Sequence, residues 1–216
     1  KVISLATKVL HHQIEEQFRN LPENLPDVPD YIKVNLHHQL RPYQEQALQH
    51  FIFAQRARNA DKTFNHLLFH MATGSGKTLV LAGTILYLFK EMEHRHFIFF
   101  VNRDAIIKKT ADNLTNQASA KYIFQKGGII IDGERIQIQL ADAFPLHPAK
   151  NTIYLKITTI QKLHMDLNSP RENSLSFEAL KETKVVLLAD EAHHINVLTK
   201  NGKTKGKFPE FQEKSW

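Results

Sequence analysis

Cysteine is absent from this sequence of 216 residues, and long apolar runs are absent as well. Without cysteine the chain has neither a disulfide framework nor a thiolate metal site, and it fits a protein of the cytoplasm, where we expect it. No apolar run approaches the roughly 20 residues that span a bilayer, so we expect no membrane partner. Residues 1–10 lack the long apolar core and the small-residue cleavage site of a signal peptide. The remaining class is an ordinary globular domain, with 42% hydrophobic and 23% charged residues.

Acidic residues are fewer than basic residues in this chain. Lys and Arg number 28 against 22 Asp and Glu, which leaves a formal net charge of +6. A sequence pI of about 9.4 suits a partner that carries phosphates. A basic surface that merely keeps the protein in solution explains the same numbers, and charge alone does not decide between the two.

Periodicity divides the chain into a short N-terminal part and one larger domain. Apolar residues recur at roughly helical spacing over residues 1–20, and prolines at positions 22, 26 and 29 interrupt the chain after them. We therefore expect a helical appendage with a proline-containing linker over 1–35. Residues 36–216 have the length of one domain with a single core.

Short apolar runs alternate with helical patterns through the larger domain. We predict helices and buried strands in turn, with helices over 40–58, 78–92, 104–116 and 177–181 and strands over 67–71, 97–101, 153–157 and 185–188. Turn signals at 127–128 and 132–133 predict one or two hairpins within 122–140. The alternation predicts an α/β fold, a mostly parallel sheet with helices on both faces, whose ligands bind where the strands end.

A glycine-rich turn lies between the predicted strand at 67–71 and the helix that follows it. The turn reads Ala72-Thr73-Gly74-Ser75-Gly76-Lys77-Thr78. Its two glycines let the backbone fold around an anion, and the start of the next helix adds amide groups and its dipole. Lys77 is placed to reach the β- and γ-phosphates of a nucleotide, and the Thr78 hydroxyl to ligate Mg²⁺. A turn with an incidental lysine is the alternative, but strand, loop, Lys-Thr pair and helix together indicate a nucleotide site.

Two carboxylates, Asp190 and Glu191, follow the last predicted strand. Asp190 suits outer-sphere binding of the Mg²⁺ held by Thr78, and Glu191 suits polarising the water that attacks the γ-phosphate. An Asp-Glu pair after a strand is by itself a common solvated end. With Lys77 of the phosphate loop 113 residues earlier (190 − 77), the pair becomes a specific signal.

These residues resemble the superfamily-two helicases, whose phosphate loop has the same spelling. One departure from the general motif is Met71, which stands at the position of its first glycine. Asp190 to His193 spell Asp-Glu-Ala-His, the sequence after which the DEAH group is named. From Leu40 to His194 the chain looks like the motor subunits of restriction enzymes, the type III and type I Res subunit family. The resemblance implies a RecA-like P-loop NTPase domain that uses ATP and Mg²⁺.

Several further residues take roles from the same resemblance. Gln44 matches the glutamine of the Q motif that reads the adenine edge, with Arg41 or Tyr43 stacking on the base; the alternative is an exposed polar helix start. His193 would couple ATP hydrolysis to movement. The alternatives are a position that is merely on the surface and a metal site with His194, which no third close ligand supports. Arg103 and Thr159 match motifs that contact the nucleic-acid backbone, although a threonine at a strand end is as often a helix cap.

The resemblance implies an ATP-dependent DNA translocase or helicase, the Res subunit of a restriction endonuclease, that contacts duplex DNA through its backbone. It also implies two partners, a second RecA-like domain beyond Trp216 of the same full-length chain and a methyltransferase or specificity subunit. The second domain would supply an arginine finger, which contributes roughly 10³–10⁵ in rate in related systems. We therefore expect the isolated fragment to be nearly inactive. Two alternatives remain open: the motor of an RNA or DNA-repair helicase, and an ATP-dependent switch module without translocation.

Overall fold

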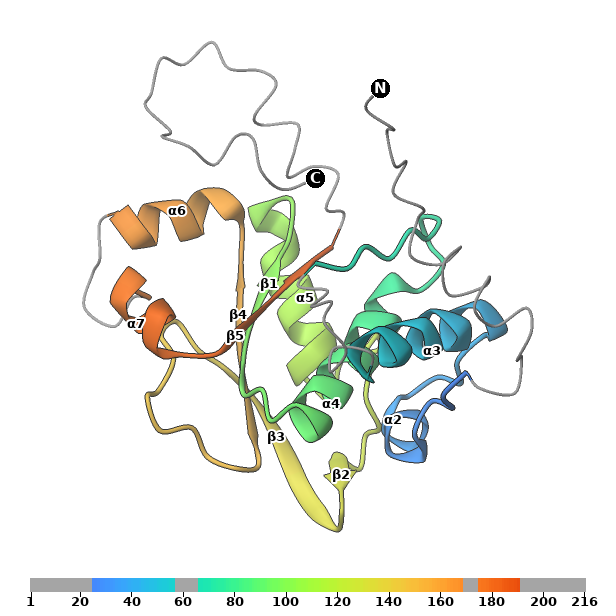
Figure 1. Ribbon diagram of the computed structural model, residues 1–216. Coiled ribbons are helices and arrows are strands. Elements are labelled where there is room, and N and C mark those ends of the chain that lie inside the picture. Colours follow the sequence, from blue (N-terminus) through green and yellow to red (C-terminus); the bar gives the residue numbers. More distant parts are fainter. Residues whose placement is uncertain (1–24, 57–65, 169–174, 191–216) are drawn as a thin grey trace, which may run out of the picture.

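A mixed sheet between two helical layers is the centre of the computed structural model, which describes residues 25–56, 66–168 and 175–190 (Figure 1). The helices are α2 Asp30–Asn35, α3 Pro42–Arg56, α4 Lys77–Glu91, α5 Asp104–Thr115, α6 Ile160–Asn168 and α7 Phe177–Glu182. The strands are β1 His96–Phe100, β2 Ile129–Ile131, β3 Glu134–Leu140, β4 Thr152–Thr158 and β5 Val185–Ala189. None of the described helices combines the length and the apolar character required to cross a membrane.

The five-stranded sheet has the order β2-β3-β4-β1-β5. Only β2 and β3 pair in antiparallel fashion, around a turn at Asp132 and Gly133, where both residues have positive φ angles of 55° and 79°. The pairs β3–β4, β4–β1 and β1–β5 are parallel, and β1 sits between β4 and β5 with Phe99 opposite Ile157 and Leu188. The predicted α/β class with a mostly parallel sheet is therefore confirmed.

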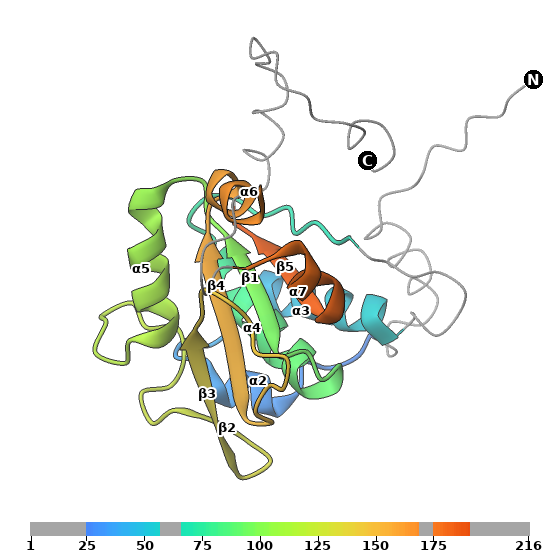
Figure 2. The same cartoon turned by 90° about the vertical axis from the view of Figure 1, so that its left-hand side faces the viewer.

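The two faces of the sheet are covered by different helices, as the quarter turn to Figure 2 shows. Helices α2 to α5 cover the face that carries Phe97 and Phe99 of β1, and these side chains belong to the main core. Helices α6 and α7 lie on the opposite face, where Ile98 and Phe100 are buried with Phe144. Alternate residues of β1 thus enter two cores, which explains why every residue of this strand is buried.

Helix α4 is the main support of the first core. All residues from Leu79 to Phe89 are buried, which is typical of a helix enclosed on all sides. It packs against α3 at Gly83, where an added Cβ would lie 3.0 Å from a methyl carbon of Leu48. Because α4 ends shortly before β1 begins, its N-terminus points toward the end of the sheet at which β1 finishes (Figure 1).

One prediction about a strand is wrong. Residues 67–71 form no strand among the described residues: the segment has no pairing partner there, and Leu68 is 79% exposed. Local hydrophobicity predicted a strand, but a strand needs a neighbour to satisfy its backbone. Within 122–140 the prediction of one or two hairpins is met by one, β2–β3, and β3 continues past it to pair with β4. The glycines at 127 and 128 lie in a loop whose Phe124 forms an isolated bridge with Leu36.

Helices α2 and α6 were not predicted, and the predicted helix over 1–20 lies outside the described residues. Both missed helices are short, with six and nine residues. Val28, Ile32 and Leu36 are buried in the main core, so residues 28–36 pack as part of the sheet domain. An appendage remains a prediction for residues 1–24.

Candidate functional site

The phosphate loop has the backbone that an anion site requires. Gly74 and Gly76 adopt left-handed φ angles of 78° and 80°, and α4 begins at the next residue, Lys77. The Ser75 amide and hydroxyl both donate to the carbonyl of Ala72, at 3.2 and 2.7 Å, which closes the turn. No side chain caps the start of α4. The first amide groups of this helix therefore remain available to an anion.

The residues around this helix start are open to a ligand. Thr73 and Gly74 are exposed, and Lys77 and Thr78 are half-buried. A Cβ added at Gly74 would meet nothing within 4 Å, so the loop has open space on that side. Lys77 has no carboxylate partner among the described residues. The donor set, with backbone amides, an ammonium and a hydroxyl, fits the phosphates and Mg²⁺ of a nucleotide.

Two side chains of α3 hold the loop in place, a function that the sequence did not indicate. Gln44 is 3% exposed, and its Nε2 donates to the carbonyl of Ser75 at 2.7 Å. The Tyr43 hydroxyl donates to the same carbonyl at 2.9 Å. The Oε1 of Gln44 accepts from the backbone amide of Arg41 at 2.9 Å, which fixes the orientation of the side-chain amide. The start of α3 and the phosphate loop thus form one hydrogen-bonded unit.

The adenine contact predicted for Gln44 would use the same side-chain amide that holds this unit together. The amide of Gln44 already bonds to Arg41 and Ser75, so in this arrangement it positions the loop. Arg41 is exposed, and its guanidinium donates to the Tyr43 hydroxyl at 3.3 Å. Contact of Gln44 and Arg41 with a base stays a prediction. No sequence signal announced the loop contact, because it joins residues 31 positions apart through a side chain.

Asp190 lies where the sequence predicted, directly after β5. Its backbone amide donates to the carbonyl of Phe100 at 3.0 Å, so the pairing of β5 with β1 extends to this residue. Its side chain is half-buried at the end of the sheet toward which the start of α4 also points. Glu191 and His193 lie outside the described residues. Among the described residues, no group of three or more His, Asp or Glu is arranged to hold a metal ion, so the Mg²⁺ site remains a prediction.

The two residues predicted to contact nucleic acid differ in their surroundings. Arg103 is exposed in extended conformation, between the end of β1 and the start of α5. Thr159 is 4% exposed, and its hydroxyl oxygen accepts from the amide of Lys162 at 3.3 Å, as a helix cap does. Lys162 also pairs with Asp104 at 3.2 Å, which joins the starts of α6 and α5. The structure thus presents Arg103 to a ligand and encloses Thr159.

Comparisons with known proteins agree with this geometry. The family model described as "Type III restriction enzyme, res subunit" matches residues 37–211. The chain is 38% identical over 186 residues to the probable type III restriction-modification enzyme HindVIP Res subunit of Haemophilus influenzae, covering 83% of the chain and 35% of that relative. It is 30% identical over 156 residues to the type I restriction enzyme SsaAORF53P endonuclease subunit of Staphylococcus saprophyticus, covering 71% and 14%. No solved structure matches the chain.

The family match extends over most of the chain, including the phosphate loop and Asp190. The chain spans about a third of the first relative and less of the second. A mostly parallel sheet with a phosphate loop at the start of α4 is consistent with the RecA-like P-loop fold of this family. The chain therefore belongs to the family of type III restriction enzyme Res subunits, as a RecA-like helicase motor domain.

Proposed function

We propose that the protein binds ATP at this phosphate loop and hydrolyses it to move along, or open, duplex DNA as the Res subunit of a restriction enzyme. The observation that carries the proposal is the uncapped start of α4 behind two left-handed glycines, with Lys77 as its first residue. Such a helix start combines free amides, a dipole and an ammonium, a combination that suits a triphosphate. The family match adds the helicase context.

Each residue of the site has a proposed task. Lys77 binds the β- and γ-phosphates, while the backbone of Thr73 to Gly76 surrounds them. Thr78 would ligate Mg²⁺ and Asp190 would bind the same ion through its water; the ion would neutralise charge on the phosphates. Glu191 orients and polarises the attacking water, and His193 couples hydrolysis to movement. Gln44 and Tyr43 hold the carbonyl of Ser75, and with it the loop, through the hydrogen bonds described above.

The proposed motor is completed by other parts of the full protein. A second RecA-like domain would contribute an arginine finger, worth roughly 10³–10⁵ in rate in related systems. We therefore propose that the isolated domain binds ATP and hydrolyses it very slowly. The relatives are a type III restriction-modification enzyme Res subunit and a type I restriction enzyme endonuclease subunit. A methyltransferase or specificity subunit is accordingly the proposed partner, and the cytoplasm, with its DNA, the proposed location.

Glu191→Gln in the full protein tests this function. The variant keeps the shape of the side chain and its hydrogen bonding but loses the carboxylate that orients water, so it should bind ATP and fail to turn it over. The measurement is steady-state ATP hydrolysis with and without duplex DNA. If the wild type hydrolyses ATP equally fast with and without nucleic acid, the protein is a switch module. If RNA stimulates hydrolysis more strongly than DNA does, it is an RNA helicase. A variant with wild-type turnover would remove Glu191 from the chemistry.

A further inference from the structure

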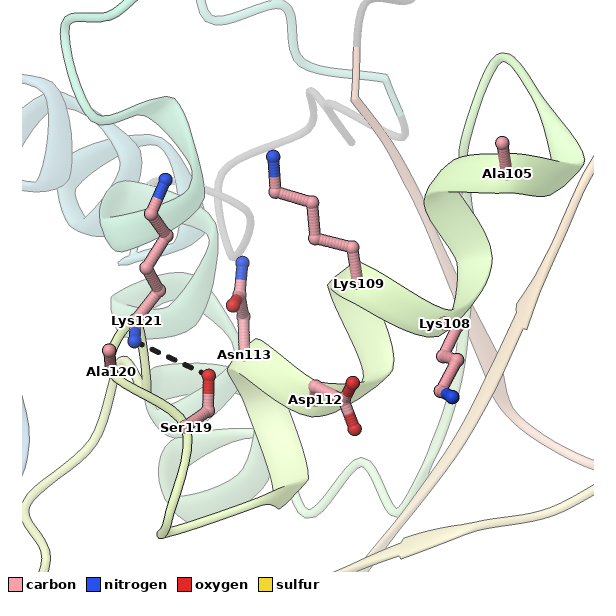
Figure 3. A pocket seen from close by; sticks show the side chains of 8 residues that line it. All are labelled: Ala105, Lys108, Lys109, Asp112, Asn113, Ser119, Ala120 and Lys121. Carbon is pink, nitrogen blue, oxygen red and sulfur yellow. Dashed lines mark hydrogen bonds between the residues drawn. The ribbon is translucent and has the colours of Figure 1, made fainter.

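A basic hollow of about 370 Å³ lies beside α5, apart from the phosphate loop (Figure 3). One wall is the face of α5 that carries Lys108, Lys109, Asp112 and Asn113, and the other is the loop after this helix, with Ser119 to Lys121. The core-facing side of α5 is a different one, on which Leu114 is buried. The hollow is therefore a surface feature, and packing of the sheet does not account for its charge.

The lysines of the hollow have no counter-charge in ion-pair contact within the part of the chain that the structure describes. None of Lys108, Lys109 and Lys121 has a carboxylate partner among the described residues. In Figure 3 the side chains of Lys109, Asn113 and Lys121 extend toward the same side of the hollow. Asp112, the one acid of the lining, points to the other side together with Lys108. Two ammonium groups thus extend toward the same side of the hollow with an amide between them, and an anion bound there would be attracted to both.

The shape and lining of the hollow suit a polymer of phosphates. From Ala105 to Asn113 the helix advances by about 12 Å, eight residues at 1.5 Å each. One strand of duplex DNA carries a phosphate every 3.4 Å of its axis, so this length spans roughly three to four phosphates. The lining contains no aromatic side chain on which a base could stack. Flexible lysines with an amide between them are the groups that contact a nucleic-acid backbone without reading its sequence.

We propose that Lys109 and Lys121, with Asn113 between them, bind the phosphate backbone of DNA and form a contact surface additional to Arg103. This inference rests on the proposed function, because it presumes that the protein acts on DNA. Arg103 is exposed and precedes the same helix, about 9 Å along its axis from Lys109, at six residues and 1.5 Å each. The two surfaces together extend the contact with DNA along α5 from the end of β1 to the loop at 116–121.

The test is the double variant Lys109→Gln/Lys121→Gln of the full protein, measured for duplex DNA affinity at several salt concentrations on two unrelated sequences. Each lost phosphate contact lowers the slope of log affinity against log salt by about 0.9, so the double variant should lose about 1.8. At 0.1 M salt its binding should be weaker by at least roughly tenfold, and equally for both sequences. The matched control is Lys126→Gln/Lys150→Gln, which removes the same charge from two exposed lysines outside the hollow.

The outcomes separate this inference from the proposed function. A wild type that neither binds duplex DNA nor hydrolyses ATP faster in its presence overturns both. If the wild type binds duplex DNA and hydrolyses ATP faster in its presence, but the two double variants have equal salt slopes of DNA binding, the lysine surface alone is overturned. The motor function then stands. A loss confined to one sequence overturns it as well, because it would mean base readout. Thermal unfolding is the control for folding. Both double variants should unfold at the wild-type temperature, so that a loss of DNA affinity does not come from misfolding.

Discussion

Gly76→Ala tests how α3 holds the phosphate loop. Gly76 has a φ of 80°, which costs an alanine about 1–2 kcal/mol. The added Cβ would also overlap with Nε2 of Gln44. To escape, Gln44 must give up its hydrogen bonds to Ser75 and Arg41, at about 1 kcal/mol each. We therefore expect a total destabilisation of about 3–4 kcal/mol, and weaker ATP binding because the loop is no longer held.

Gly74→Ala is the matched control for the backbone effect. Gly74 has nearly the same φ, 78°, but an added Cβ there meets nothing within 4 Å. Only the backbone cost remains, so this variant should lose about 1–2 kcal/mol. The measurement is denaturant unfolding of each variant, with calorimetry for ATP affinity.

A double-mutant cycle with Gln44→Ala isolates the contact itself. Without the Gln44 side chain the overlap disappears, so Gly76→Ala should then cost no more than Gly74→Ala does in the wild type. The two substitutions at positions 44 and 76 should thus be non-additive by about 2 kcal/mol, the value of the shared hydrogen bonds. Strict additivity, or equal costs for the two glycine variants, would refute the reasoning that Gln44 positions this loop.

Three further substitutions have expected results. Lys77→Ala removes the ammonium from the β/γ-phosphates and should weaken ATP binding by about 10–100-fold in calorimetry; equal affinities would contradict the phosphate-loop assignment. Arg103→Ala should lower the salt slope of DNA binding by about one unit on any sequence, and an unaltered slope would make Arg103 a residue of the helix start only. Burial lowers the pKa of His96, whose ring lies 4.9 Å from that of Phe144. Because the unfolded chain then binds the extra proton, stability should fall as pH drops below the ordinary histidine value of about 6.5. The variant His96→Phe should remove this dependence of stability on pH, measured by denaturant unfolding at several pH values. The variant His147→Phe, at an exposed position, should retain it.

Much of the fold was predictable because its helices and strands have strong local patterns. Helix α4 and strands β1, β4 and β5 lie within one or two residues of their predicted bounds. Each is a continuous apolar run or stripe bounded by polar residues, so local sequence suffices to define it. The segment 67–71 has an equally apolar pattern, yet it forms no strand among the described residues, since a strand also depends on a partner that the local pattern does not contain.

The sequence by itself predicted the chemistry of the candidate site. Gly74, Gly76 and Lys77 are consecutive or nearly so, and a loop of this spelling before a helix leaves its amides free whatever surrounds it. Only the tertiary structure decided which side chains support that loop and which charges stand together. The bonds from Tyr43 and Gln44 to Ser75 depend on how α3 packs against α4, and the juxtaposition of Lys109 with Lys121 depends on the path of the loop after α5. Contacts between distant residues follow from the packing of whole elements, and no local period encodes that packing.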